Sequence, residues 1–312
     1  MQTQHPLVAI KCLVFNHEPY LRECLDGFVM QQTDFPFVAI VHDDASTDHS
    51  ADIIREYAER YPDIIRPIYE TENQYSKGTL GRVMDAAMDA TDAKYIAMCE
   101  GDDYWTDPHK LQKQVDFLES HPDYSMCANA TQWLLSDGAL VSSPLCSLET
   151  DCDIPTNAIV RRGGLYINLT SMVYRRKLIH KEDFSWWCIA DVGDYPLCIA
   201  ASLRGKVRFL ADKMSIYRYE CQGSWTSRAK QTDQTRHFLN EYKWLRLFDK
   251  ETNHQYRQAV YEHLFPRMIR TIFKNGELSL FEYVTAYHYS QLHYSAIRIL
   301  KDIIRHYLPK KS

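Results

Sequence analysis

Four times within its first 120 residues, this chain follows a short apolar segment rich in β-formers with a segment of helical spacing. The apolar segments cover residues 7–15, 37–44, 64–69 and 95–100, and the helical ones cover 20–31, 46–61, 79–90 and 110–121. Strands buried on both faces of a parallel sheet have such continuous apolar runs. The alternation therefore predicts an α/β fold built on a mostly parallel, doubly wound sheet with helices on both faces.

Acidic residues follow two of these predicted strands. Asp43 and Asp44 end the second, and Glu100, Asp102 and Asp103 follow the fourth. Crowded carboxylates repel one another and are costly to desolvate, so their clustering needs a reason. The carboxyl ends of parallel strands meet at one edge of the sheet, where ligands bind. The pattern predicts a ligand site at that edge.

Composition excludes several classes of protein. The formal net charge of -5 over 312 residues argues against a nucleic-acid partner. No segment approaches the ~20 apolar residues of a membrane-spanning helix, and residues 1–12 lack the pattern of a signal peptide. Nine scattered cysteines without a CxxC pair indicate a reduced compartment and no zinc site. We therefore expect a cytoplasmic location.

Sequence motifs narrow the chemistry further. The chain has no GxGxxG, GxxxxGK[ST] or GxSxG, which excludes a dinucleotide fingerprint, a P-loop and a nucleophile elbow. What remains is "LVFNHEPYL", "HDDASTD" and "EGDDYWTDPHKLQKQ", each at the end of a predicted strand and in this order. Together these motifs resemble the family 2 glycosyltransferases, which have the glycosyltransferase-A fold. The last motif is similar to a branch found among bacterial polysaccharide-building enzymes, and the resemblance covers roughly residues 7–225.

The resemblance implies a nucleotide-sugar donor and a divalent cation, Mn²⁺ or Mg²⁺, that neutralises the departing diphosphate. Asp102 is the implied metal ligand, with Asp103 as the alternative, and Glu100 is implied at the ribose side. A solvated acidic turn is the other reading of these three residues. Asp44 is implied to hydrogen-bond the base, with the rest of that pocket formed by Phe15, Asn16, Glu18 and Asp43.

Other residues carry weaker expectations. Asp43 and Asp44 could instead cap the following helix, for which Ser46 to Asp48 are also suited. Arg82, in the helix before the acidic motif, is the basic candidate for a phosphate or ribose contact, and an ordinary solvated arginine is the alternative.

The second half of the chain supplies the candidates for acid–base chemistry. "GDYPL" resembles the family's base-bearing segment, which makes Asp194 the candidate base of an inverting transfer and Asp191 the reserve. A helix is expected to start there and to end at Gly205, and its N-terminus would favour an ionised carboxylate. Asp194 could also be a helix cap alone.

Residues 207–220 are expected to form two short strands. The candidate contacts to acceptor or diphosphate are Trp186, Trp187, Arg218 and Trp225, and the first two could equally be core residues.

We expect a catalytic domain over residues 1–230 and a C-terminal helical region over 231–312. The domain would divide into a nucleotide-sugar-binding half, 1–123, and an acceptor half, 124–230. Residues 295–312 form an amphipathic basic segment that would lie on the inner membrane surface or pack on the domain.

The resemblance implies a metal-dependent, inverting transfer from a nucleotide sugar, a UDP-sugar as first choice, to a glycan or lipid-linked saccharide in bacterial surface polysaccharide synthesis. One rival is a sugar-1-phosphate nucleotidyltransferase, which would need a glycine-rich loop after the first strand. The other is a non-catalytic nucleotide-sugar-binding or assembly protein, in which Asp194 would not matter.

Overall fold

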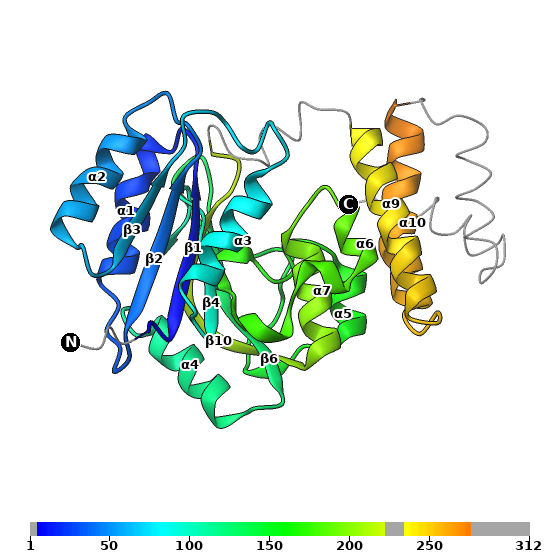
Figure 1. The fold of residues 1–312 in the computed structure, drawn as a ribbon. Coiled ribbons are helices and arrows are strands. Elements are labelled where there is room, and N and C mark those ends of the chain that lie inside the picture. Colours follow the sequence, from blue (N-terminus) through cyan, green and yellow to red (C-terminus); the bar gives the residue numbers. More distant parts are fainter. Residues whose placement is uncertain (1–4, 222–233, 276–312) are drawn as a thin grey trace.

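A single ten-stranded sheet organises the molecule (Figure 1). The computed structural model describes residues 5–221 and 234–275. Its main strand order is β3-β2-β1-β4-β9-β6-β10-β5, with β7 paired to β6 and β8 to β10.

The first half of the sheet is parallel, as predicted. Its strands are β1 (Val8–Val14), β2 (Phe37–Asp43), β3 (Ile65–Tyr69) and β4 (Tyr95–Met98). Helices α1 (Glu18–Val29), α2 (Ser50–Arg60) and α3 (Leu80–Ala90) connect them. The helix α4 (Lys110–Ser120) follows the two-residue strand β5 (Tyr104–Trp105). Strand β1 lies between β2 and β4, with Val14 opposite Asp43 and Lys11 opposite Met98.

The second half is mixed. Strand β9 (Val173–Arg175) runs antiparallel to both β4 and β6 (Tyr124–Leu134). Strand β10 (Lys206–Arg218) is parallel to β6 and continuous, so the expectation of two short strands is wrong. Register shifts after Leu210 and Lys213 are β-bulges, which bend one strand without ending it. The short strands β7 (Leu140–Ser142) and β8 (Cys152–Asp153) pair antiparallel at the margins.

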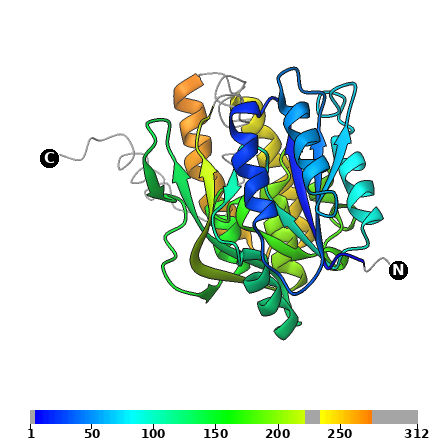
Figure 2. The same cartoon turned by 90° about the vertical axis from the view of Figure 1, so that its left-hand side faces the viewer.

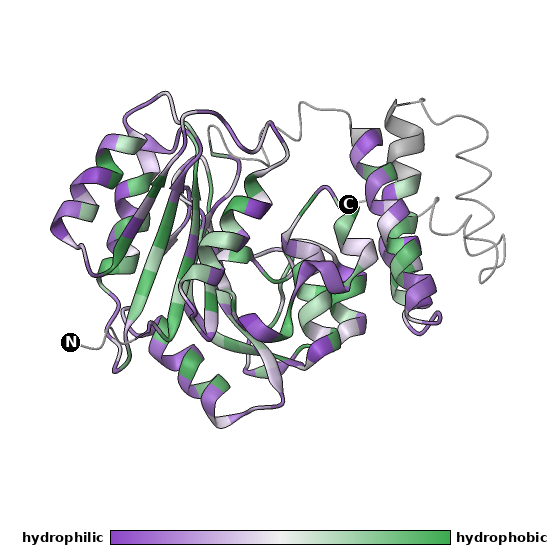
Figure 3. Ribbon diagram, viewed as in Figure 1, coloured by the Kyte–Doolittle hydropathy of each residue, from purple (hydrophilic) through white to green (hydrophobic). Residues whose placement is uncertain are grey.

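Two apolar cores lie on the two faces of the sheet. Because side chains alternate along a strand, β1 directs Val8, Ile10, Cys12 and Val14 toward α1, α2 and α4. The other face packs against α3, α5 (Thr156–Arg162) and α7 (Asp194–Arg204), which ends at Gly205 as expected. In Figure 3 the central strands are largely hydrophobic and the outward helix faces hydrophilic.

Two long C-terminal helices, α9 (Gln234–Glu251) and α10 (Arg257–Asn275), lie against this second face. Figures 1 and 2 show them side by side, next to α5 and α6 (Ser185–Cys188). Trp186 of α6 is 1% exposed and stacks on Trp244 of α9. Within the described ranges no helix is long and apolar enough to cross a membrane. The predicted membrane-surface segment, 295–312, lies outside the described residues.

Gly163, which follows α5, tests how closely α10 packs on the catalytic domain. Its φ of 80° and ψ of -166° form a conformation that is essentially restricted to glycine, and an added Cβ would lie 2.3 Å from Cε1 of His263 on α10. We expect Gly163→Ala to lower the free energy of unfolding by about 2 kcal/mol or more. Urea denaturation of both proteins would measure it.

Gly138→Ala is the matched control, because Gly138 also has a positive φ but no atom within 4 Å of an added Cβ. Its backbone strain should cost roughly 1 kcal/mol. Equal losses in the two variants would mean that α10 does not pack against Gly163.

Candidate active site

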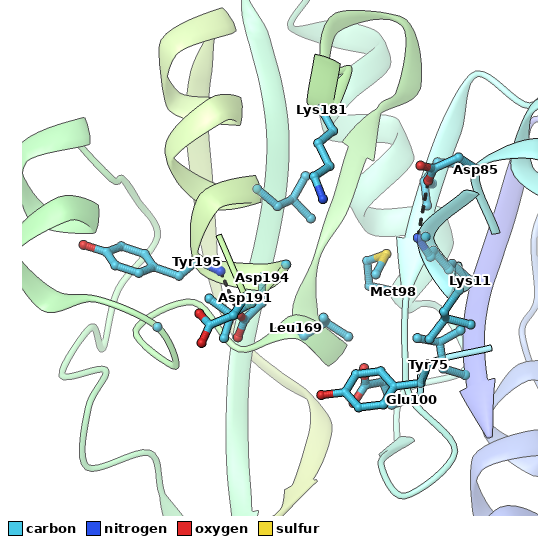
Figure 4. A pocket seen from close by; sticks show the side chains of 18 of the residues that line it. Lys11, Tyr75, Asp85, Met98, Glu100, Leu169, Lys181, Asp191, Asp194 and Tyr195 are labelled. Carbon is cyan, nitrogen blue, oxygen red and sulfur yellow. Dashed lines mark hydrogen bonds and ion pairs between the residues drawn. The ribbon is translucent and has the colours of Figure 1, made fainter. Parts of the chain in front are cut away.

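A cavity of about 1120 Å³ opens at the carboxyl ends of β1 and β4, on the sheet face that carries α3 and α7. Phe15, Asp44, Glu100, Asp102 and Asp103, from the first half of the chain, line it, and Glu100 lies on one side. The opposite side carries Asp191 and Asp194, from the second half (Figure 4). The structure thus brings the two predicted groups of acids to a single cavity.

The acidic loop after β4 is held by main-chain contacts. Gly101 N donates to Leu13 O at 2.9 Å, and a Cβ on this glycine would lie 2.7 Å from Nδ1 of His17. Arg218 donates through Nη1 to the carbonyl oxygen of Asp102 at 2.6 Å and through its main-chain N to Oδ1 of Asp103 at 3.0 Å. The loop conformation is therefore fixed from both β1 and β10.

The carboxyls of Asp102 and Asp103 suit a divalent cation. Both are buried and line the cavity. Burial raises the pKa of Asp103 well above its usual value, and the neighbouring charge of Asp102 raises it further. A cation would relieve this repulsion. In the part of the chain that the structure describes, no three His, Cys, Asp or Glu side chains form a complete metal site. Mg²⁺ and Mn²⁺ fit such a partial set, because they take one or two carboxylates plus phosphate and water oxygens.

Asp44 anchors the loop between β3 and α3. Its carboxylate accepts hydrogen bonds from the main-chain N of Gln74 at 2.6 Å and of Tyr75 at 3.0 Å. Tyr75 is exposed and, like Glu100, lines the cavity (Figure 4). The preceding residue, Asp43, is buried, and burial raises its pKa.

Asn16 and Glu18 do not line this cavity. Asn16 has a φ of 57°, and its Oδ1 accepts from Thr47 N at 2.7 Å. Glu18 Oε2 accepts from His49 N at 3.0 Å. Both side chains tie the loop after β1 to the loop after β2, so their predicted contact with a base would be indirect.

Of the remaining predicted site residues, Trp187 alone is found at the cavity among those that the structure describes. Arg82 is exposed on α3 away from the cavity, and Trp186 lies in the core. Trp187 lines the cavity. The Arg218 guanidinium pairs with Glu23 and stacks over Tyr104, so it does not line the cavity. Trp225 lies outside the described residues.

Asp194 begins α7, and its Oδ1 accepts from Tyr195 N at 2.8 Å. Burial raises its pKa, although this helix N–H bond opposes the shift. Asp191 is ion-paired with His237 of α9, with 2.8 Å between Oδ2 and Nδ1, and its main-chain N donates to Asn240 Oδ1 at 3.0 Å. The two carboxyls therefore differ: Asp191 has a cationic partner when His237 is protonated, and Asp194 is held by its own helix.

Sequence reasoning missed several groups that line the cavity: Lys11, Tyr75, Lys181, His237, Glu241 and Arg267. The last three come from α9 and α10, so the region assigned to a separate C-terminal part forms one wall. Lys11 had a visible signal, since it is the one charged residue in the apolar run of residues 7–15.

Comparison with known proteins identifies the family. Residues 12–179 match the family described as glycosyl transferase family 2, and this chain belongs to that family. An uncharacterized protein of Mycobacterium tuberculosis is 37% identical over 222 residues, which are 70% of this chain and 61% of the relative. The chain thus matches less than two thirds of that relative's length.

Solved structures share the fold. TarS of S. aureus, residues 1–349 in complex with UDP-GlcNAc, aligns with a TM-score of 0.64 at 18% identity, covering 90% of this chain and 79% of TarS. A mannosyltransferase from Pyrobaculum calidifontis, in complex with GDP-Man and Mn²⁺, aligns with a TM-score of 0.55 at 17% identity, covering 95% of this chain and 83% of that one. The predicted glycosyltransferase-A fold is confirmed.

The anchoring role of Asp44 makes a testable prediction. Asp44→Ala would leave the N–H groups of Gln74 and Tyr75 without their acceptor, so the loop between β3 and α3 should open more often. We expect faster hydrogen exchange at these two amides and unchanged exchange in α4. Unchanged exchange at both amides would show that another group holds the loop.

Proposed function

We propose that this protein is a metal-dependent, inverting glycosyltransferase that moves a sugar from a UDP-sugar to a glycan or lipid-linked saccharide of a bacterial surface polysaccharide. The observation that carries the proposal is one cavity that is lined by the Asp102–Asp103 pair and by Asp194, with Glu100 of the same acidic loop lying across the cavity from Asp194 (Figure 4). A transferred sugar between them would have the departing diphosphate on one side and the attacking hydroxyl of the acceptor on the other. The named ligands of the two structural neighbours, UDP-GlcNAc and GDP-Man with Mn²⁺, support a nucleotide-sugar donor and a cation.

Asp102 and Asp103 would hold the cation, which supplies charge neutralisation to the departing diphosphate. Arg218 and Gly101 keep the carboxylate pair in place through the main chain. Asp44 holds the loop that brings Tyr75 to the cavity, and the nucleoside would bind near this loop.

Asp194 would accept the proton of the attacking acceptor hydroxyl. Its raised pKa brings a carboxylate closer to the basicity that proton transfer needs near neutral pH. Because a raised pKa means protonation at a higher pH than for a free aspartate, transfer should fall on the acid side at a pH above the usual range of aspartic acid. A cytoplasmic location and surface contact with a membrane stay predictions from the sequence.

The base assignment predicts a difference between Asp194→Asn and Asp191→Asn. The first should reduce transfer by about 10²-fold or more, while donor binding persists. The second, which removes the partner of His237, should have a smaller effect. Single-turnover transfer and donor binding would be measured for each. A larger loss in the Asp191 variant would exchange their roles, and no loss in either would favour the non-catalytic rival.

The metal assignment predicts that Asp102→Asn abolishes Mn²⁺-dependent stabilisation by a nucleotide sugar. Thermal shift with UDP-, GDP-, CMP- and dTDP-sugars, with and without Mn²⁺, would measure it and would identify the nucleotide. Asp63→Asn, at an exposed carboxylate remote from the cavity, is the control. Stabilisation that is equal in the wild type and the Asp102 variant would contradict the assignment.

A further inference from the structure

A lysine in the middle of a buried parallel strand is expensive, and Lys11 of β1 is such a residue. Its side chain is 18% exposed and points to the cavity face of the sheet, since Ile10 and Cys12 on either side point into the opposite core. Its nearest carboxylate oxygen, Oδ1 of Asp85 on α3, is 3.8 Å away, which is too long for a hydrogen bond. Among the described residues, the ammonium group therefore has an ion pair but no hydrogen-bond acceptor.

Lys181 reaches the same cavity from the opposite wall. It lies in the short 3₁₀ turn Lys181–Asp183, and Figure 4 shows its side chain directed into the cavity across from Lys11 and Asp85. Within the described part of the chain, Lys181 forms no ion pair. Burial lowers the pKa of Lys11, and the charge of Lys181 lowers it further, against the opposing effects of Asp85 and Glu100. Two ammonium groups thus face one partly buried space.

Several other charged groups line this space. Arg176 pairs with Asp89 at 2.5 Å and with Asp92 at 3.2 Å, so its charge is offset by these two acids. The carboxylate of Asp85 is 57% exposed, so solvent screens its attraction to Lys11. Glu182 lines the cavity beside Lys181.

We propose that Lys11 and Lys181 form a subsite for an anionic group, a carboxylate or phosphate, carried by one of the sugar substrates. A neutral hydroxyl could accept one hydrogen bond from either lysine, but only a negative charge would also offset the cost of burying the Lys11 ammonium group and the repulsion between the two lysines. The two lysines line the same cavity as Glu100 and Asp194, where the proposed function places the sugar ring. The inference rests on that proposed function.

Two sources can supply such an anion: the transferred sugar, as a uronic acid, or the acceptor. Isothermal titration in Mn²⁺ would compare donors that differ only at C6, UDP-glucuronate against UDP-glucose and UDP-galacturonate against UDP-galactose. A second arm would titrate glucuronic acid against glucose, and glucose 6-phosphate against glucose, into the enzyme saturated with UDP and Mn²⁺. We expect the acidic member of a pair to bind at least about tenfold more tightly in one of the two arms.

Lys11→Met and Lys181→Met should each remove that preference, while binding of UDP with Mn²⁺ stays unchanged. Lys177→Met is the matched control, since Lys177 lies in the same segment and does not line the cavity. Lys181 is exposed, so its variant should fold even if Lys11→Met does not. Equal binding of acidic and neutral partners in both arms, or a preference that survives both lysine variants, would overturn the subsite. Failure of UDP to bind with Mn²⁺ would instead refute the proposed function.

Discussion

The parallel pairing of β1 with β2 on one side and β4 on the other determines where the chemistry of this molecule lies. In this register Val14 is opposite Asp43 and Lys11 is opposite Met98, so the residues after all three strands arrive at one edge. A slip of β1 by one residue would turn Lys11 into the core formed with α1 and α2. The cost of burying that ammonium among apolar side chains makes the slip unfavourable, so a residue at the cavity also helps to specify the sheet.

The acids at this edge are held by main-chain N–H groups. Asp44, Asp103 and Asp194 each accept from a backbone nitrogen. The Arg218 guanidinium, which contacts the acidic loop, is directed at a carbonyl oxygen and at Glu23 instead. Main-chain donors fix the position of a carboxylate without cancelling its charge. The site can thus remain attractive to a cation that arrives with the donor.

The parts that the sequence predicted depend on local patterns. The four strands, the helix ending at Gly205 and the acidic edge follow from periodicity and from residues adjacent in the chain. The order of the second half could not be read in this way, because β9 lies between β4 and β6 through pairing over long sequence separations. Bulges let β10 continue through a polar stretch that resembles a turn. The family resemblance implied Asn16 in a base pocket, whereas its Oδ1 accepts from Thr47 N in the loop after β2.

The boundary expected near residue 230 would place α9 and α10 outside the catalytic domain, although both helices contribute residues to the wall of its cavity. Glu241 of α9 is the clearest case: burial opposes its ionisation, but His263 and Arg267 of α10 lower its pKa overall. A buried ion network of this kind seldom adds stability over apolar packing. It does fix the relative position of α9 and α10, and Glu241 and Arg267 both line the cavity. Through Asn240 and His237, α9 also holds the loop that precedes Asp194. The position of Asp191 and of the loop before the candidate base therefore depends on the packing of α9, and a catalytic unit that ended at residue 230 would lack these contacts.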